Sequence, residues 1–224
     1  MQEHTAPMPE NTAHPKPRIE SLSDLIFGLA LSVGALSLLS KPPNTPAEVT
    51  SDILAFAFSF LILIYVWMSY TRIMSVLPLE TRTTLVLNIL MLFLVVVEPY
   101  VFYLVTLLGH AGEHGIIDYA SVIYALDMGG LMAILGFFEH ELSVEEKGLL
   151  PQELLPKHRR ARNALFLSAA LFFVTALPQF WYWQIGDTPV RFYLWFAPLA
   201  VTSISRNIEG RRKPSKIPPS IATG

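Results

Sequence analysis

Long apolar stretches separated by short polar segments dominate the chain. Each stretch is bounded by charged residues, glycine or proline, and most reach the roughly 18 residues that a helix needs to cross the hydrocarbon core of a bilayer. The pattern predicts an all-α, polytopic membrane protein with six transmembrane helices. The six stretches are Leu22–Leu39, Ile53–Thr71, Leu85–Leu108, Ile116–Phe138, Ala164–Gln184 and Val190–Ser205.

Composition agrees with a membrane protein and removes several kinds of chemistry. Apolar residues make up 52% of the 224 positions and charged residues 15%, well below the roughly 25% charged share of soluble domains. Cysteine is absent, which excludes disulfides, thiolate metal sites, iron–sulfur clusters and cysteine nucleophiles. A single soluble domain is therefore excluded, and so is any thiol chemistry.

Basic residues fall on one side of the predicted topology. With six spans, fourteen of the sixteen lysines and arginines lie on the side of the termini, and only Lys41 and Arg191 lie opposite. By the positive-inside rule, both termini are cytoplasmic. We expect residues 1–17 to be a disordered cytoplasmic tail, 18–206 the six-helix transmembrane domain, and 207–224 a basic cytoplasmic tail near anionic lipid head groups.

The first apolar stretch begins with a carboxylate, Asp24, that is followed at once by a long uncharged run. An ionised side chain in hydrocarbon costs at least about 2.5 kcal/mol, so Asp24 needs a partner. Arg18 and Ser23 are the nearest candidates in sequence. The alternative is an ordinary helix start, in which an acid lies near the positive end of the helix dipole.

These residues carry a resemblance to a known family. The pattern Arg-x-x-x-Leu-Ser-Asp at Arg18–Asp24 resembles the Arg-x-x-x-Phe-Ser-Asp signature of the transmembrane protein 175 family, with Leu22 where phenylalanine is usual. The segment Trp67–Arg72 resembles that family's Trp-x-x-His-His-Arg, with both histidines replaced. Asn88 and Pro99 stand in a third matching segment, so the resemblance covers roughly residues 18–104.

The resemblance implies a tetrameric, potassium-permeable cation channel, whose four first helices line a central pore. It places a hydrophobic constriction at Leu29, a hydroxyl layer at Ser32 and further apolar rings at Val33 and Leu36. These positions follow one helical stripe, and a ring of leucines can gate a pore by dewetting. Without the resemblance, such a stripe is more typical of a face that meets lipid or another helix. The implied polar network that fixes the helices comprises Arg18, Ser23, Asp24, Trp67 and Arg72.

The sequence says less about selectivity than about permeation. It has no Thr-Val-Gly-Tyr-Gly filter loop of the kind used by most potassium channels. Leu29 and Ser32 replace the isoleucine and threonine that are frequent in the family. The resemblance therefore supports cation permeation more than a strong preference for potassium over sodium.

Two acids, Glu98 and Asp127, fall inside predicted spans. Intramembrane acids are candidates for proton carriers or ion ligands. Equally, each fits a buried acid that is hydrogen-bonded by a neighbouring Tyr or Ser, or an acid near the outer interface of the membrane. The competing function is a proton-coupled secondary transporter that uses both carboxylates, with a helix broken near Pro99.

An enzyme is not expected, because no paired-histidine zinc motif or nucleophile elbow is present. The sequence predicts no metal site and no cofactor beyond permeant K⁺ or other monovalent cations. The expected partners are three further copies of the chain and the lipid bilayer, with no nucleic acid. The resemblance to prokaryotic relatives implies a multi-pass protein of a prokaryotic plasma membrane.

Overall fold

The computed structural model describes most of the chain. The predicted tails, 1–17 and 207–224, lie outside the described residues. Residues 199–200 and 202–205 of the sixth apolar stretch also lie outside them. The described residues are 18–39, 43–77, 81–109, 114–186, 188–198 and 201.

Five long helices make up the bulk of the described structure. They are α1 (Arg18–Ser37), α2 (Pro46–Met74), α3 (Arg82–Gly109), α4 (His114–Ser143) and α5 (Leu155–Thr175). A single 3-10 turn, η1 (Glu145–Lys147), lies between α4 and α5. The short elements after α5 are α6 (Gln179–Tyr182), β1 (Gln184–Ile185), β2 (Thr188–Pro189) and α7 (Val190–Leu194). The two strands pair antiparallel as a minimal hairpin, so the described residues are not entirely helical.

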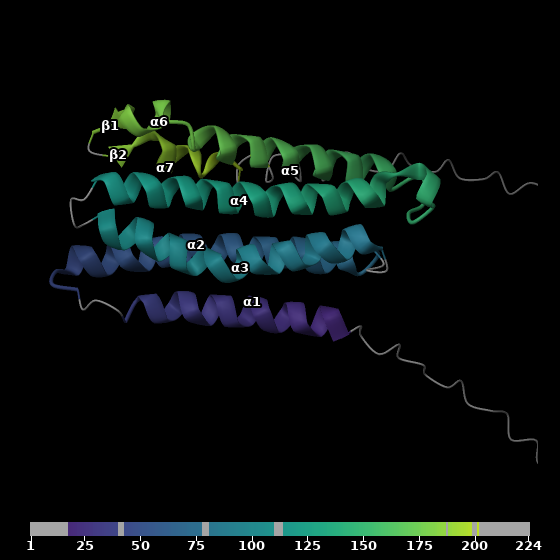
Figure 1. The fold of residues 1–224 in the computed structure, drawn as a ribbon, viewed down its shortest axis with the longest axis horizontal. Coiled ribbons are helices and arrows are strands. Elements are labelled where there is room, and N and C mark those ends of the chain that lie inside the picture. Colours follow the sequence, from purple (N-terminus) through teal and green to yellow (C-terminus); the bar gives the residue numbers. More distant parts are fainter. Residues whose placement is uncertain are drawn as a thin grey trace, which may run out of the picture.

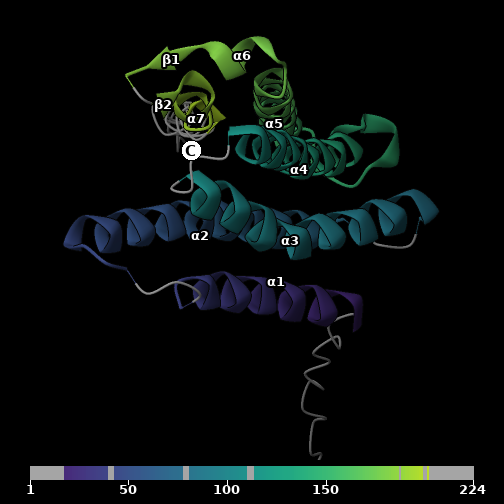
Figure 2. The same ribbon diagram turned by 60° about the vertical axis from the view of Figure 1, so that its left-hand side comes forward.

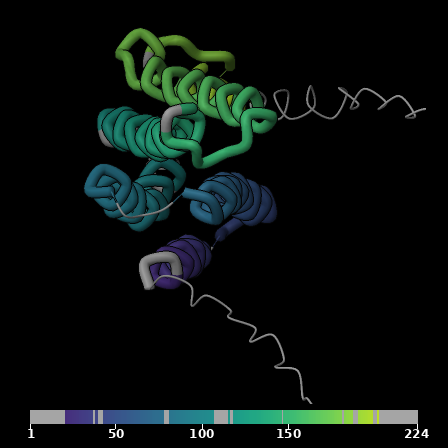
Figure 3. The backbone as a smooth tube through the Cα atoms, turned by 90° about the vertical axis from the view of Figure 1, so that its right-hand side faces the viewer, coloured from purple at the N-terminus to yellow at the C-terminus, as the bar shows by residue number. Residues whose placement is uncertain are grey.

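The helices stack in layers. Helix α1 forms one outer layer, α2 and α3 form the next, and α4 separates them from α5 and the short elements (Figures 1 and 2). The view along the helices in Figure 3 shows α2 and α3 side by side between α1 and α4. Helix α4 lies at the centre, and Tyr124, Met128, Leu131 and Leu135 on it are fully buried. Helix α1 consequently has one face packed inside and one face open.

The first four predicted stretches each coincide with one of the long helices. Among the described residues, α2, α3 and α4 are long and apolar enough to cross a membrane, and α1 carries a shorter apolar run, Ser21–Leu36. These lengths fit a bilayer core of about 30 Å.

The fifth predicted stretch, Ala164–Gln184, is wrong in position. The helix runs instead from Leu155 to Thr175, with Pro156 in its first turn. The basic residues taken as a boundary lie inside the helix, because a helix can continue from an apolar stretch into charged residues. The chain turns after Thr175, where Pro178 has no N–H to continue the ladder. Of the sixth stretch, the described part contains the short α7, a turn at 195–196 and the helical residues 197, 198 and 201.

Helix α2 has a clear local start signal. Pro46 occupies its first turn, where the missing N–H costs nothing. The Thr45 hydroxyl accepts a hydrogen bond from the Glu48 backbone N–H at 3.2 Å. The Glu48 carboxylate in turn accepts from the Asn44 N–H at 2.8 Å. This arrangement is close to a capping box, so the sequence itself fixes where α2 begins.

Close packing of α4 on α5 depends on glycines of α4. A Cβ atom built at Gly129 would come within 2.5 Å of the Phe173 ring, and one at Gly136 within 3.0 Å of the Phe166 ring. Apolar side chains gain little by leaving lipid for a protein interface, so association of membrane helices relies on such close contact. Gly129 and Gly136, seven residues apart on α4, therefore leave room for the Phe173 and Phe166 rings of α5. This contact between the two helices is called the α4–α5 seam below.

Replacing Gly129 with alanine is expected to loosen the α4–α5 seam and lower stability by about 1 kcal/mol, because the added methyl displaces the Phe173 ring. The matched control is Gly115→Ala on the same helix, where a Cβ atom meets nothing within 4 Å. Thermal unfolding in detergent compares the two variants. Equal melting temperatures would show that the seam does not depend on this glycine.

Candidate functional site

The open face of α1 is uncharged and carries all four predicted pore residues. Leu29 is 56% exposed, and Val33 and Leu36 are exposed to a similar extent. Ser32 is also exposed, and its hydroxyl donates to the Gly28 carbonyl at 2.8 Å. That bond satisfies the hydroxyl hydrogen within the helix and leaves the oxygen lone pairs available to a cation. The structure therefore places a leucine-rich stripe with one hydroxyl layer on the surface of the single chain.

The opposite face of α1 determines which side points outward. Ser23, Phe27 and Ala30 are buried, and they follow helical spacing along one stripe. The Phe27 ring lies 5.9 Å from the Tyr70 ring of α2. Further along, Gly34 comes close to Phe56 of α2 and Pro99 of α3. Because this face is packed, rotation of α1 would expose buried aromatic surface.

A polar network joins the start of α1 to the end of α2. The indole N–H of Trp67 donates to the Asp24 carboxylate at 3.0 Å. One turn away, the Tyr70 hydroxyl donates to the Ser23 hydroxyl at 2.9 Å. Trp67 and Tyr70 are three residues apart and so share one face of α2. The network therefore fixes both the depth and the rotation of α1 against α2.

Ser23, Asp24 and Trp67, three of the five predicted network residues, take part in these hydrogen bonds. The fourth participant, Tyr70, was not predicted from the sequence. Tyr70 stands where the family pattern has its first histidine, and its position three residues after Trp67 was the available signal. Arg72 is exposed and makes no side-chain hydrogen bond or ion pair within the described part of the chain. The helix includes Arg18, but the placement of its side chain lies outside what the structure describes.

The two intramembrane acids lie in the interior, behind α1. Glu98 is fully buried, and the Ser59 hydroxyl donates to one of its oxygens at 2.8 Å. Asp127 is buried on α4. The hydrogen-bonded alternative considered for Glu98 is thus present for one oxygen. Neither acid belongs to the open stripe of α1.

At the other end of the bundle, an ion pair ties α7 to α4. The guanidinium of Arg191, which is almost fully buried, donates to the Asp118 carboxylate. Nearby, the Trp195 indole donates to the Thr175 hydroxyl at 3.1 Å. Sequence reasoning did not identify this contact, because Arg191 and Asp118 are 73 residues apart. Its role in the described structure is to attach the segment after the hairpin to α4 and α5.

No arrangement for a metal ion is present among the described residues. No group of three or more His, Cys, Asp or Glu side chains is placed to hold one within that part of the chain. The candidate site therefore consists of the open stripe of α1 and the polar network that holds it. The Asp24–Trp67 and Ser23–Tyr70 hydrogen bonds of this network are called the polar anchor below.

Comparisons with known proteins agree with this geometry. The family described as "Endosomal/lysosomal potassium channel TMEM175" matches residues 18–99, a range that includes the stripe, the network and Glu98. No curated protein matches the chain. A crystal structure of a variant of the potassium channel MtTMEM175 has 18% sequence identity and a TM-score of 0.62, covering 92% of this chain and all of that one.

A second crystal structure, of a lysosomal potassium-selective channel TMEM175 homologue from Chamaesiphon minutus, has 19% identity and a TM-score of 0.56. It covers 84% of this chain and 96% of that chain. At such identities the two structures show a shared fold. The likeness in sequence to that family lies in the first three helices. In residues 18–99, this helical membrane protein is similar to the TMEM175 family.

Proposed function

We propose that the protein is a potassium-permeable cation channel, in which the open stripe of α1 lines a central pore shared by four copies of the chain. The observation that carries the proposal is an uncharged, exposed stripe held in one orientation by a polar anchor. The anchor lies within the segment that matches the family described as a potassium channel. One helix cannot enclose a pore, so the stripe requires copies of itself from other chains.

The chemistry of the stripe suits a gated path for a monovalent cation. Rings of Leu29, Val33 and Leu36 side chains would form a narrow apolar passage, which excludes water unless it widens. A ring of Ser32 oxygens between them would replace part of an ion's hydration shell. The stripe offers no carboxylate ring, so attraction of cations would come from oxygen dipoles rather than from full charges.

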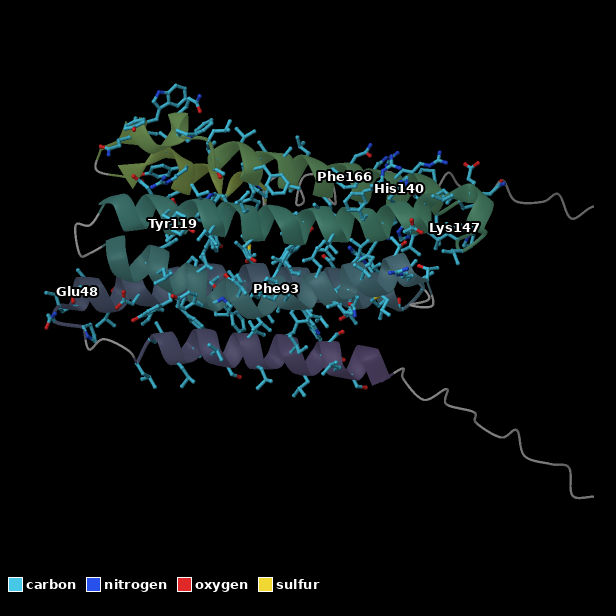
Figure 4. All side chains as sticks on the ribbon, viewed as in Figure 1. Glu48, Phe93, Tyr119, His140, Lys147 and Phe166 are labelled. Carbon is cyan, nitrogen blue, oxygen red and sulfur yellow. The ribbon has the colours of Figure 1, made fainter. Side chains whose placement is uncertain are left out.

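We further propose that both termini face the cytoplasm of a prokaryotic cell and that the protein lies in its plasma membrane. The start of α1 and the α2–α3 and α4–α5 connections lie at one end of the bundle (Figure 1). Lys147 and His140 lie at that end and Glu48 at the other (Figure 4). Arg72, Arg82 and the basic start of α5 belong to the same end. The positive-inside rule assigns this end to the cytoplasm.

The direct test is current through the purified protein in planar bilayers under a potassium gradient. A channel predicts passive current that reverses near the potassium equilibrium potential. Empty bilayers processed in the same detergent are the control. Absence of potassium current, combined with a proton flux that depends on Glu98, would replace the channel with the proton-coupled transporter.

The tetramer has a test of its own. The mass of the detergent-solubilised particle, corrected for bound detergent, is expected to correspond to four chains of 25.1 kDa each. A particle that stays monomeric in several mild detergents and in lipid nanodiscs would remove the shared pore.

A further inference from the structure

Three helices bring polar side chains together at the middle of the bundle. Ser59 lies near the midpoint of α2, Glu98 near that of α3, and Tyr124 and Asp127 near that of α4. All four side chains are buried, and Glu98 and Tyr124 have no exposed surface at all. In a protein that spans a bilayer, helix midpoints lie in the hydrocarbon layer. The cluster of Ser59, Glu98, Tyr124 and Asp127 is called the mid-membrane cluster below.

Packing between α3 and α4 sets the two acids at one level. The Phe102 and Tyr124 rings lie 5.5 Å apart, and a Cβ atom at Gly130 would come within 2.9 Å of Leu94. These two contacts fix an antiparallel register in which Glu98, between Leu94 and Phe102, lies opposite the segment around Asp127. Glu98 and Asp127 lie close enough to interact electrostatically with each other and with the Tyr124 hydroxyl.

The hydrogen-bonding capacity of the mid-membrane cluster is largely unused. The Ser59 hydroxyl satisfies Oε1 of Glu98. Oε2 of Glu98, both carboxylate oxygens of Asp127 and the Tyr124 hydroxyl have no hydrogen-bond partner. Proline at position 99 has no N–H, so the Val95 carbonyl also lacks its usual helical donor. The cluster therefore has acceptors in excess and few donors.

No positive charge compensates the two acids. The titratable groups that face one another here are Glu98, Asp127 and Tyr124, and no Lys, Arg or His belongs to the mid-membrane cluster among the described residues. Arg191 is engaged at the outer end of α4 with Asp118. Two ionised carboxylates in hydrocarbon, without a counter-charge, are unfavourable.

We propose that Glu98 and Asp127 form a proton-binding carboxyl pair inside each protomer. A bound proton neutralises a carboxylate and turns it into a donor, which supplies what the cluster lacks. A proton also needs no space, which matters because Glu98, Tyr124 and Met128 are completely enclosed. A dehydrated metal cation would need several oxygens arranged around a cavity.

The carboxyl pair is separate from the open stripe of α1. Pro99 faces α1 at Gly34, with 3.9 Å between the Pro99 Cβ atom and a Cβ atom built on the glycine. The adjacent Glu98 bonds to α2 instead. The inference therefore does not rest on the proposed pore, and it stands or falls independently of potassium current.

Infrared spectroscopy of the full-length protein in lipid tests the proposal. Protonated carboxyl groups give a C=O stretching band that shifts on transfer to D₂O. We expect this band to persist at neutral pH, far above the pKa of about 4 at which exposed carboxyls ionise. Glu98→Gln and Asp127→Asn should each remove part of the band and the double variant all of it. The exposed acid Glu153, changed to Gln, is the matched control and should leave the band intact.

The variants chosen keep the fold testable. Glutamine at position 98 is isosteric with a protonated glutamate and still accepts from Ser59, and the wild-type spectrum needs no variant. A wild-type protein without the band at neutral pH would overturn the proposal. Radioactive sodium that binds to wild type and not to Glu98→Gln, with the band absent, would replace the proton with a metal cation and overturn it equally.

Discussion

Replacing Leu29 with alanine is expected to raise the potassium conductance several-fold. In the proposed pore, four Leu29 side chains form an apolar constriction that opposes water entry. Alanine removes most of that apolar bulk, so the passage widens and wets more easily. The measurement is single-channel conductance in planar bilayers, with potassium on both sides and then with sodium replacing potassium on one side.

Leu167→Ala on α5 is the matched control for this effect. Leu167 is 52% exposed, close to the 56% of Leu29, but it lies on the far side of the bundle from α1. The same substitution there should leave conductance unchanged. If both variants conduct like wild type, the open stripe of α1 meets lipid or another helix and does not line the pore.

Removal of the Asp24 carboxylate is expected to abolish most of the current and to lower the stability of the protein. Asp24→Ala leaves the Trp67 indole N–H without its acceptor, and a partly buried donor left unpaired costs about 1–3 kcal/mol. Helix α1 would then lose a contact that fixes its rotation. Thermal unfolding and potassium flux into liposomes, measured on the same preparation, report the two effects.

A double-mutant cycle separates the hydrogen bond from general damage. Asp24→Ala combined with Trp67→Phe should show a coupling free energy of about 0.6 kcal/mol, the average for hydrogen bonds between membrane helices, and at most about 1.7 kcal/mol. Asp24→Ala combined with Tyr70→Phe is the control, because Tyr70 bonds to Ser23 instead. If the two single substitutions of the first pair lower the unfolding free energy by strictly additive amounts, the Asp24–Trp67 contact contributes nothing to stability.

The positions of the first four helices could be read from the sequence because apolar length and polar boundaries coincide there. Helix α5 could not be placed in the same way. Its start contains Lys157, Arg159, Arg160 and Arg162, which resemble a loop between spans. The helix nevertheless begins at Leu155 and contains all four, so a run of charged residues does not mark the end of a helix.

The predicted pore residues stay a prediction, because the structure shows only where their side chains lie. The spacing of Leu29, Ser32, Val33 and Leu36 follows from helix geometry alone, and the structure leaves all four exposed. Contacts across helices have no local signal. Ser59 and Glu98 are 39 residues apart, and Ser23 and Tyr70 are 47 apart. Which helices become neighbours, and in which register, depends on packing such as the Gly129–Phe173 contact.

The end of the family match also has a structural reading. The match stops at Pro99, whereas the fold similarity extends over 92% of the chain. The matched segment contains the open stripe and its anchor, which lie on α1 and α2. A fold can extend beyond a sequence match, because packing tolerates many combinations of apolar side chains, provided that volume and shape are kept.

Accessibility of single cysteines tests the pore most directly. The natural chain contains no cysteine, so each introduced thiol is the only target for a water-soluble, positively charged thiol reagent. Cysteine at Leu29, Ser32 or Leu36 should make potassium current sensitive to rapid block, while cysteine at the equally exposed Leu167 or Phe93 should not. Block at the α1 positions alone is the result that a pore lined by α1 predicts. Current that is insensitive at every α1 position, or blocked equally from Leu167, would contradict it.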